Sequence, residues 1–171
     1  FVVRRQRGDG GWGSTIIAGY PWFADWGRDT MISLPGLMLA TNRFDEALDT
    51  LLTFARHMRR GLVPNCFHDR NEPVYNTVDA SLWYVHAVRE YSRASGRDVP
   101  PALIDACREI VDAYRNGTDF GIKEGADGLI NASDAHAALT WMDAHRDGIM
   151  YTPRRGKPVE INALWYNAQC A

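Results

Sequence analysis

The sequence has few of the features that mark membrane, nucleic-acid-binding or disulfide-stabilised proteins. Its three cysteines are odd in number and form no CxxC pair, so neither a disulfide framework nor a zinc site is indicated. No stretch approaches the about 20 apolar residues of a membrane helix, and no charged-then-apolar leader is present. The 21 acidic and 19 basic residues give a net charge of −2, which argues against nucleic acid and anionic lipid as partners. We therefore expect a cytoplasmic protein with no nucleic-acid or membrane partner.

The remaining composition is that of an ordinary globular unit. The 171 residues are 46% hydrophobic and 23% charged, which is enough to bury a substantial core. The chain begins with Phe1 rather than methionine and stops at Ala171 in what reads as the middle of a helix. We therefore expect residues 1–171 to be one domain, incomplete, whose other partner is the remainder of the same polypeptide.

The most informative segment is residues 19–30, which read GYPWFADWGRDT and combine aromatic rings, acids and an arginine. A pyranose has apolar C–H faces that stack on aromatic rings, and hydroxyl groups that carboxylates and guanidinium groups bind. The segment therefore suits a sugar subsite. In the alternative interpretation Trp22 and Trp26 are core anchors, while Arg28 and Asp29 only cap the following helix. The segment alone leaves both interpretations open.

Hydrophobic spacing predicts helices and no convincing strand. Apolar residues at helical intervals indicate helices near residues 31–39, 44–58, 79–91, 102–114 and 158–168. The first and third are apolar on most sides, as expected of buried helices, whereas the second and fourth have a charged face. Pro35 is expected to kink the first helix. This alternation of buried and surface helices predicts an all-α fold.

The lengths of the connections indicate where the functional face lies. Long segments lead into the buried helices, and short links lead out of them. If the buried helices run roughly parallel, all the long loops gather at one end of the molecule, where function usually resides. Polar clusters fall on that end at residues 26–30, 75–79 together with Asn65, 139–143 and 159–162. Taken singly, Asp29, Asp79 and Glu160 could each be an acid that merely stabilises a helix N-terminus.

Asp143 differs from these acids because it follows Thr140, Trp141 and Met142 inside a long loop with no evident helix start. A carboxyl group beside an indole and a thioether is partly desolvated, which raises its pKa towards values useful for donating a proton. Asp143 is therefore the candidate general acid, and the alternative is an acid bonded to loop amides. No metal site is indicated, because none of the histidines has metal-ligand spacing: His57, His68, His86, His136 and His145. The sequence indicates no cofactor.

Four motifs together resemble the C-terminal amylo-α-1,6-glucosidase domain of glycogen debranching enzymes of the bacterial and archaeal type. They are residues 19–30, 75–83 (YNTVDASLW), 139–144 (LTWMDA) and 152–165 (TPRRGKPVEINALW), and the resemblance spans essentially the whole chain. It implies an (α/α)6 toroid, here incomplete, with the active site in a cup formed by the loops before the inner helices. It also implies inverting hydrolysis of the α-1,6-linked glucose left at a trimmed branch of glycogen or limit dextrin.

The resemblance implies specific roles for matched positions. Asp143 is implied as the proton donor. The residues implied to line the glucose subsite are Trp22, Trp26, Arg28, Asp29, Asn65, Asp79, Trp141, Glu160 and Asn162. An inverting glycosidase needs a second carboxylate as base, which in this family lies downstream of the residues that match here. The resulting hypothesis is a glycoside hydrolase, whose isolated 171-residue chain is expected to be inactive, and the alternative is a non-catalytic glucan-binding module.

Overall fold

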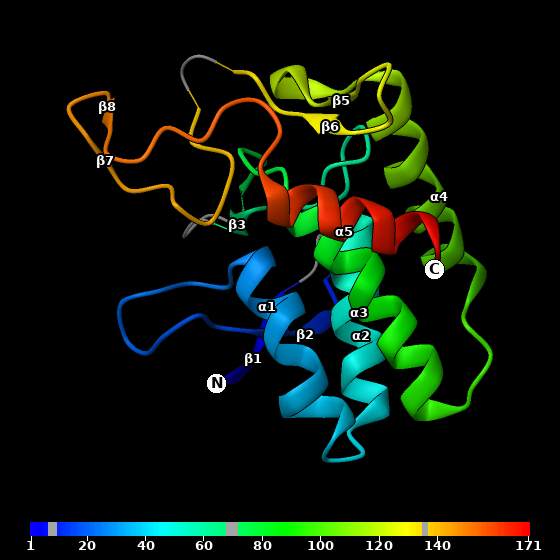
Figure 1. The fold of residues 1–171 in the computed structure, drawn as a ribbon. Helices are drawn as coiled ribbons and strands as arrows, with labels where there is room; N and C mark the ends of the chain where they lie inside the picture. Colours follow the sequence, from blue (N-terminus) through cyan, green and yellow to red (C-terminus); the bar gives the residue numbers. More distant parts are fainter. Residues whose placement is uncertain (7–9, 68–71, 135–136) are drawn as a thin grey trace.

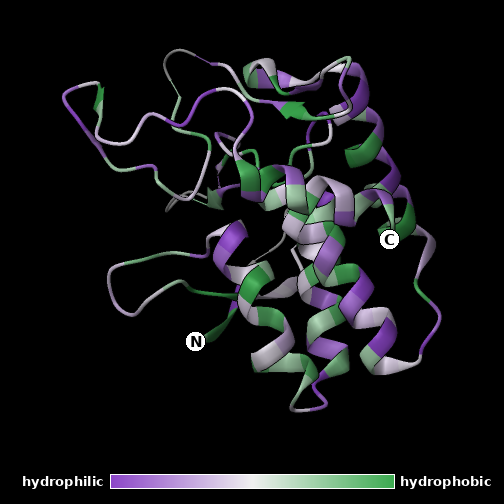
Figure 2. Ribbon diagram, in the orientation of Figure 1, coloured by the Kyte–Doolittle hydropathy of each residue, from purple (hydrophilic) through white to green (hydrophobic). Residues whose placement is uncertain are grey.

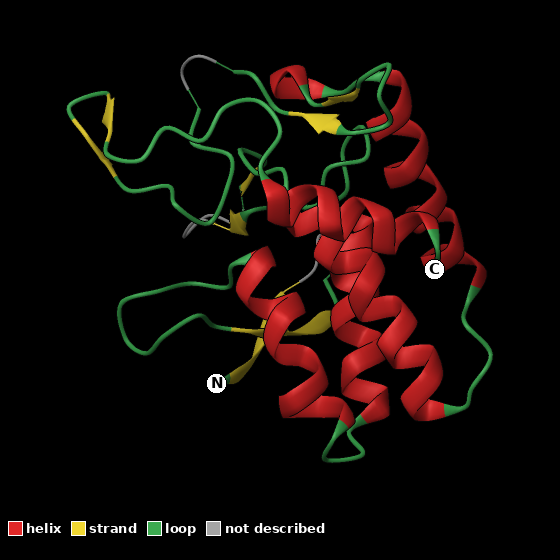
Figure 3. Ribbon diagram, viewed as in Figure 1, coloured by secondary structure: helices red, strands yellow, loops and turns green. Residues whose placement is uncertain are grey.

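The structure, a computed structural model, describes residues 1–6, 10–67, 72–134 and 137–171 (Figure 1). Five α-helices form its main body, and Figure 3 shows them beside short strands and long loops. The helices are α1 (Gly27–Leu34), α2 (Phe44–Arg56), α3 (Ala80–Ser95), α4 (Pro101–Asn116) and α5 (Val159–Gln169). Each lies where the hydrophobic spacing predicts a helix, so the helical part of the prediction is confirmed.

The end of α1 shows the effect of the proline. Pro35 has no N–H to donate, and the chain continues from it as the π-helical turn η1 (Pro35–Leu39). The turn is closed by the Ala40 N–H, which donates to the Pro35 carbonyl at 2.9 Å. The predicted kink is therefore a local widening of the helix that leads into the short link before α2.

The prediction of an all-α fold, part of a toroid, is wrong, because the structure is mixed α and β with four small antiparallel sheets. The strands pair as β1 (Val2–Gln6) with β2 (Trp12–Ile16), β3 (Cys66–Phe67) with β4 (Pro73–Val74), β5 (Lys123–Glu124) with β6 (Ile130–Asn131), and β7 (His145–Arg146) with β8 (Ile149–Met150). All four are hairpins inside the segments that the sequence had left as loops. They supply hydrogen-bond partners to backbone groups that long loops would otherwise leave unpaired.

The first hairpin carries the clearest strand signal in the sequence. β-Branched residues occupy both strands, with Val2 paired with Ile16 and Val3 paired with Thr15. Trp12 is exposed, whereas the rest of β2 is buried and packs against α2. A Cβ built on Gly13 would lie 2.4 Å from the Thr53 hydroxyl oxygen on α2, so only glycine allows this close approach. The hairpin therefore closes one side of the helical core.

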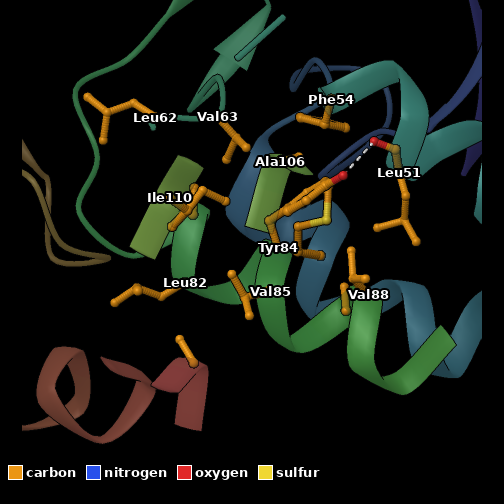
Figure 4. Packing of buried hydrophobic residues seen from close by; sticks show 14 of the residues in the cluster. Leu51, Phe54, Leu62, Val63, Leu82, Tyr84, Val85, Val88, Ala106 and Ile110 are labelled. Atoms are coloured by element: carbon orange, nitrogen blue, oxygen red, sulfur yellow. Dashed lines mark hydrogen bonds between the residues drawn. The ribbon is translucent and has the colours of Figure 1, made fainter. Parts of the chain in front are cut away.

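The hydrophobic core lies between α1, α2, α3 and α4. Figure 4 shows Tyr84 of α3 at its centre, where its hydroxyl group donates to the Leu51 carbonyl of α2 at 3.2 Å. Burial raises the pKa of Tyr84 well above its usual value. Helices α2 and α4 have mixed hydropathy in Figure 2, because one face is buried in this core and the other meets solvent.

Two of the three long segments gather on one side of the helices, as the connection lengths predict, whereas the first, which contains β1 and β2, lies lower beside α1 and α2. In Figure 1 the links at residues 40–43 and 96–100 lie at the bottom, while β3, β5, β6, β7 and β8 lie in the upper half. The segment at residues 118–157, predicted to be functional rather than disordered, contains β5 to β8 and the 3-10 turn η2 (Asp119–Gly121). Within the described residues, no helix is both long enough and apolar enough to cross a bilayer.

Candidate functional site

Backbone hydrogen bonds bring three distant segments together at the start of α1 and α3. The Gly27 N–H donates to the Asn65 carbonyl at 2.7 Å, which joins the first helix to the segment before β3. The Val78 N–H donates to the Leu139 carbonyl at 2.8 Å, which joins the start of α3 to the loop that carries Asp143. The convergence of polar clusters expected from the sequence is thus produced by the main chain itself.

A buried ion pair lies at this junction. Arg28 Nε donates to Asp79 Oδ2 at 2.7 Å, and the two side chains are only 10% and 3% exposed. The other carboxylate oxygen of Asp79 accepts a hydrogen bond from the Thr77 hydroxyl group at 2.7 Å. Arg28 Nη1 lies 3.7 Å from Asp143 Oδ2. One guanidinium group therefore connects the polar cluster at the start of α3 to the predicted general acid.

The pKa of Arg28 is raised above its usual value, so the side chain keeps its positive charge. Burial on its own lowers the Arg28 pKa, but the hydrogen bond that Arg28 donates to Asp79 and the negative charges of Asp79, Asp143 and Asp29 outweigh it and raise the pKa overall. Removal of water by the surrounding protein is the main cause of a raised pKa for Asp29, and the charge of Arg28 opposes it. The site thus combines a permanent cation with carboxyl groups in different environments.

The helix-capping alternative does not explain Asp79. This residue does stand at the N-cap position of α3, yet its side chain makes no capping hydrogen bond. The Ala80 N–H donates to the Thr77 hydroxyl oxygen at 3.3 Å instead, and the Asp79 carboxylate turns towards Arg28. Asp29 lies in the first turn of α1, where a negative charge is favourable, and its side chain is only partly exposed to water. Capping therefore remains sufficient only for Asp29.

A cavity of about 510 Å³ opens beside the ion pair, within the size range of small-ligand sites. Polar groups of the site lie on one wall, and the rest is mostly apolar. The lining residues are Arg28, Ile32, Asp79, Trp83, His86, Trp141, Glu160, Ala163, Leu164 and Asn167. Arg28 Nη2 is itself buried and has no hydrogen-bond partner among the described residues, so one cationic donor of this side chain is unsatisfied.

Glu160 enters the cavity from the first turn of α5. Both of its carboxylate oxygens accept hydrogen bonds from Arg154, which the sequence did not single out, and the bond from Nη2 to Oε2 is 2.7 Å long. The hydrogen bond from Arg154 is the main cause of a lowered Glu160 pKa, against the opposing effect of burial. Glu160 is therefore held as an anion next to the cavity.

Asp143 lies at the edge of the site, beside the cavity-lining residues Arg28 and Trp141. Its side chain is 36% exposed, so the indole and thioether remove less water from it than the sequence suggests. The neighbouring Trp141 is 55% exposed and has part of its surface in the cavity wall. The general-acid role of Asp143 stays a prediction, now with a cationic neighbour.

Five of the predicted subsite residues do not line this cavity, namely Asp29, Asn65, Trp26, Trp22 and Asn162. Asn65 is buried against Asn76 with its amide oxygen unpartnered among the described residues, and Trp26 is half-buried at the start of α1. Trp22 is 83% exposed on the segment that projects before α1. The amide of Asn162 exchanges hydrogen bonds with Ile130, at 2.7 Å to its N–H and 3.2 Å to its carbonyl, so it holds α5 against β6. Their sugar-binding roles stay predictions.

The apolar part of the cavity was missed from the sequence, although a signal was present. Ile32, Trp83 and Leu164 each follow a predicted polar residue by four positions, from Arg28, Asp79 and Glu160. Residues four apart lie on the same face of a helix. The same spacing rule, applied to the polar residues rather than to the core, would have found all three.

Among the described residues, no three histidine, cysteine or acidic side chains are grouped closely enough to hold a metal ion. His68 and His136, which entered the metal prediction, lie outside the described residues. His86 does line the cavity, with its ring 5.6 Å from that of Trp83.

Known proteins match this chain over nearly its whole length, including the residues of the site. The amylo-alpha-1,6-glucosidase family matches residues 1–170. The glycogen debranching enzyme of Saccharomyces cerevisiae is 30% identical over 215 aligned positions, which cover 90% of this chain. The chain spans only 14% of the length of that relative. The near-complete match, together with the described geometry of the motifs, shows that the chain belongs to the amylo-alpha-1,6-glucosidase family.

Proposed function

We propose that this chain forms part of an inverting α-1,6-glucosidase that releases glucose from the trimmed branch points of an α-glucan. The observation that carries the proposal is the buried pair of Arg28 and Asp79 in the lining of a cavity that also includes Trp141 and Glu160. Carboxylate and guanidinium groups suit sugar hydroxyl groups, and an exposed indole face suits the C–H face of a pyranose.

In the proposed reaction, Asp143 gives its proton to the glycosidic oxygen as the bond from that oxygen to the anomeric carbon breaks. A water molecule attacks the anomeric carbon from the opposite face and loses its proton to a second carboxylate, which inverts the configuration. Inverting enzymes place the two carboxyl groups roughly 6.5–9.5 Å apart, with room for that water. The family resemblance assigns the second carboxylate to a position downstream of the matched motifs.

The test is the variant Asp143→Asn in the complete protein. Loss of a general acid should reduce glucose release from a branched limit dextrin by about 10²-fold or more. Binding of isomaltose, measured by calorimetry, should change little, because the amide keeps the shape of the carboxyl group. Asp147→Asn is the matched control, since Asp147 lies in the turn of the neighbouring β7–β8 hairpin with its side chain 86% exposed. Unchanged turnover in Asp143→Asn would remove the assignment.

A glucan-binding module without catalysis is the second candidate, because the described cavity by itself accounts for binding but not for the second carboxylate. Calorimetric titration of the 171-residue chain with isomaltose, run beside a glucose-release assay, separates the two. Affinity without turnover, in both this chain and the complete protein, would favour the module.

A further inference from the structure

Arg154 lies inside the matched motif at residues 152–165, but the sequence analysis assigned it no role. It lies in the segment between β8 and α5, six residues before Glu160. Its guanidinium group makes two parallel hydrogen bonds to the Glu160 carboxylate, from Nη1 to Oε1 and from Nη2 to Oε2. The two side chains are 22% and 32% exposed, so the pair is largely shielded from water.

The backbone that carries Arg154 is itself fixed. Gly156 and Ala132 exchange two backbone hydrogen bonds, of 2.9 and 2.8 Å, which hold the segment against the end of β6. The Lys157 ammonium group pairs with Asp127 at 2.5 Å. Arg154 therefore reaches Glu160 from an anchored loop, and the loop keeps its position without the help of this pair.

The geometry leaves part of Glu160 available. An ionised carboxylate has about four lone-pair positions, and a two-point bond to one arginine occupies two of them. Glu160 also lines the cavity, whereas Arg154 does not. The remaining lone pairs therefore belong to the part of Glu160 that meets the cavity.

The same arginine lies within electrostatic reach of the buried ion pair. The hydrogen bond to Glu160 is the main cause of a raised Arg154 pKa, burial opposes it, and the charges of Glu160 and Asp79 add to it. Arg28 and Arg154 are thus each bound to a carboxylate that lines the cavity. A planar arginine fork fixes the orientation of its carboxylate, which a lysine cannot do.

We propose that Arg154 is a positioning residue, which holds the Glu160 carboxylate in the orientation that accepts hydrogen bonds from hydroxyl groups of a neutral sugar. The inference rests on the proposed function, because it assumes that the cavity binds a glucose unit. Arg154 acts through Glu160 and is not itself a catalytic residue.

The test compares Arg154→Lys, Glu160→Gln and the double variant in the complete protein, with branched limit dextrin as substrate and isomaltose as binding probe. We expect Arg154→Lys to raise KM and the isomaltose Kd about tenfold, with kcat changed less than about threefold, as for a lost binding interaction. Glu160→Gln should give a similar rise. The double variant should be no worse than the poorer single variant, because both changes remove one interaction.

Lys157→Gln is the matched control, since Lys157 anchors the same loop through an ion pair but does not touch the cavity. It should leave KM unchanged, and all variants should keep the wild-type unfolding midpoint. The inference would be overturned by a normal KM in Arg154→Lys or by an equal rise of KM in Lys157→Gln. It would also be overturned if the KM increases of Arg154→Lys and Glu160→Gln multiplied fully in the double variant. If Arg154→Lys fails to fold, a normal KM in Glu160→Gln overturns it alone. Absence of isomaltose binding by the wild-type protein would instead remove the proposed function on which it rests.

Discussion

Arg28 and Asp79 form the most deeply buried ion pair in the part of the chain that the structure describes. Both groups have given up water, and Arg28 still has one donor unsatisfied. Removal of one partner leaves a buried charge without compensation, which is costly in a way that an exposed pair is not. The pair therefore makes stability and the proposed sugar binding depend on the same two side chains.

We predict that Asp79→Asn lowers the free energy of unfolding by about 3 kcal/mol, because Arg28 then stays buried opposite a neutral amide. Urea denaturation at pH 7 measures the change. Glu46→Gln is the control, since Glu46 pairs with Arg43 on the exposed face of α2, and it should cost less than about 1 kcal/mol. Equal losses in the two variants would contradict the burial argument.

Replacement of Asp29 should stabilise the protein, in contrast to replacement of Asp79. Loss of water is the main cause of its raised pKa. A raised folded-state pKa means that ionised Asp29 opposes folding above that pKa, and the penalty is absent below about pH 4, where folded and unfolded states are both protonated. Asp29→Asn should therefore increase the free energy of unfolding at pH 7 and change it little at pH 3. Urea titrations at the two pH values measure this, and a decrease at pH 7 would show that the helix-capping role dominates.

For single residues, the sequence identifies which side chains carry charge but not which partner each of them binds. Asp79 and Asp29 both precede or open a helix and have the same capping signature. Only the position of Arg28, 51 residues from Asp79 along the chain, decides that Asp79 turns away from the helix end. Arg154 was missed for the same reason, because nothing local distinguishes it from Arg155.

Among the elements, α1 is positioned by its first residue. A Cβ built on Gly27 would lie 2.1 Å from the Pro64 carbonyl oxygen, and Gly27 also donates its N–H to Asn65. The next residue is Arg28, so any shift of the helix start moves the guanidinium group away from Asp79. Glycine at this position thus has a steric cause, unlike the glycines that adopt positive φ.

Gly27→Ala should therefore destabilise the protein by roughly 1–3 kcal/mol, the usual range for steric overpacking. Gly36→Ala in η1 is the control, because a Cβ there meets nothing within 4 Å, and alanine should be neutral or slightly stabilising in a helical turn. Thermal unfolding followed by circular dichroism compares the two. A Gly27→Ala variant as stable as Gly36→Ala would mean that the Pro64 segment moves freely.

The helices were predictable and the strands were not, for a physical reason. A helix is stabilised within one segment, so its 3.6-residue pattern can be read locally, as along Leu103, Ala106 and Ile110 of α4. The strands β3 to β8 are two residues long, which is too short for any alternation to appear. A turn signal did exist at Asp147 and Gly148, whose positive φ angles of 51° and 77° suit a tight hairpin.

For the molecule as a whole, the sequence predicts where the site lies better than it predicts which side chains line it. The order of long and short connections places two of the three long segments on one side, and the backbone bonds from Gly27 to Asn65 and from Val78 to Leu139 join them to the starts of α1 and α3. Connection length carries no information about which side chains point inward. That is why Trp83 and Leu164 were missed while Trp22, which is strongly exposed, was included.

The charges of the site decide which sugars it should accept. Arg28 and Arg154 pair with the carboxylates of Asp79 and Glu160, and Asp29 and Asp143 add two further acids near Arg28, in a chain of net charge −2. The excess charge of the site is negative, so an anionic sugar should be repelled and a neutral one tolerated.

We predict that glucuronic acid binds at least about tenfold more weakly than glucose at low salt, and that 0.5 M NaCl reduces this difference in affinity by screening. Calorimetric competition against isomaltose, with glucosamine as the cationic comparison, measures the difference. Equal affinity for glucuronic acid and glucose would show that the site does not discriminate against an anionic sugar, which would contradict the charge argument.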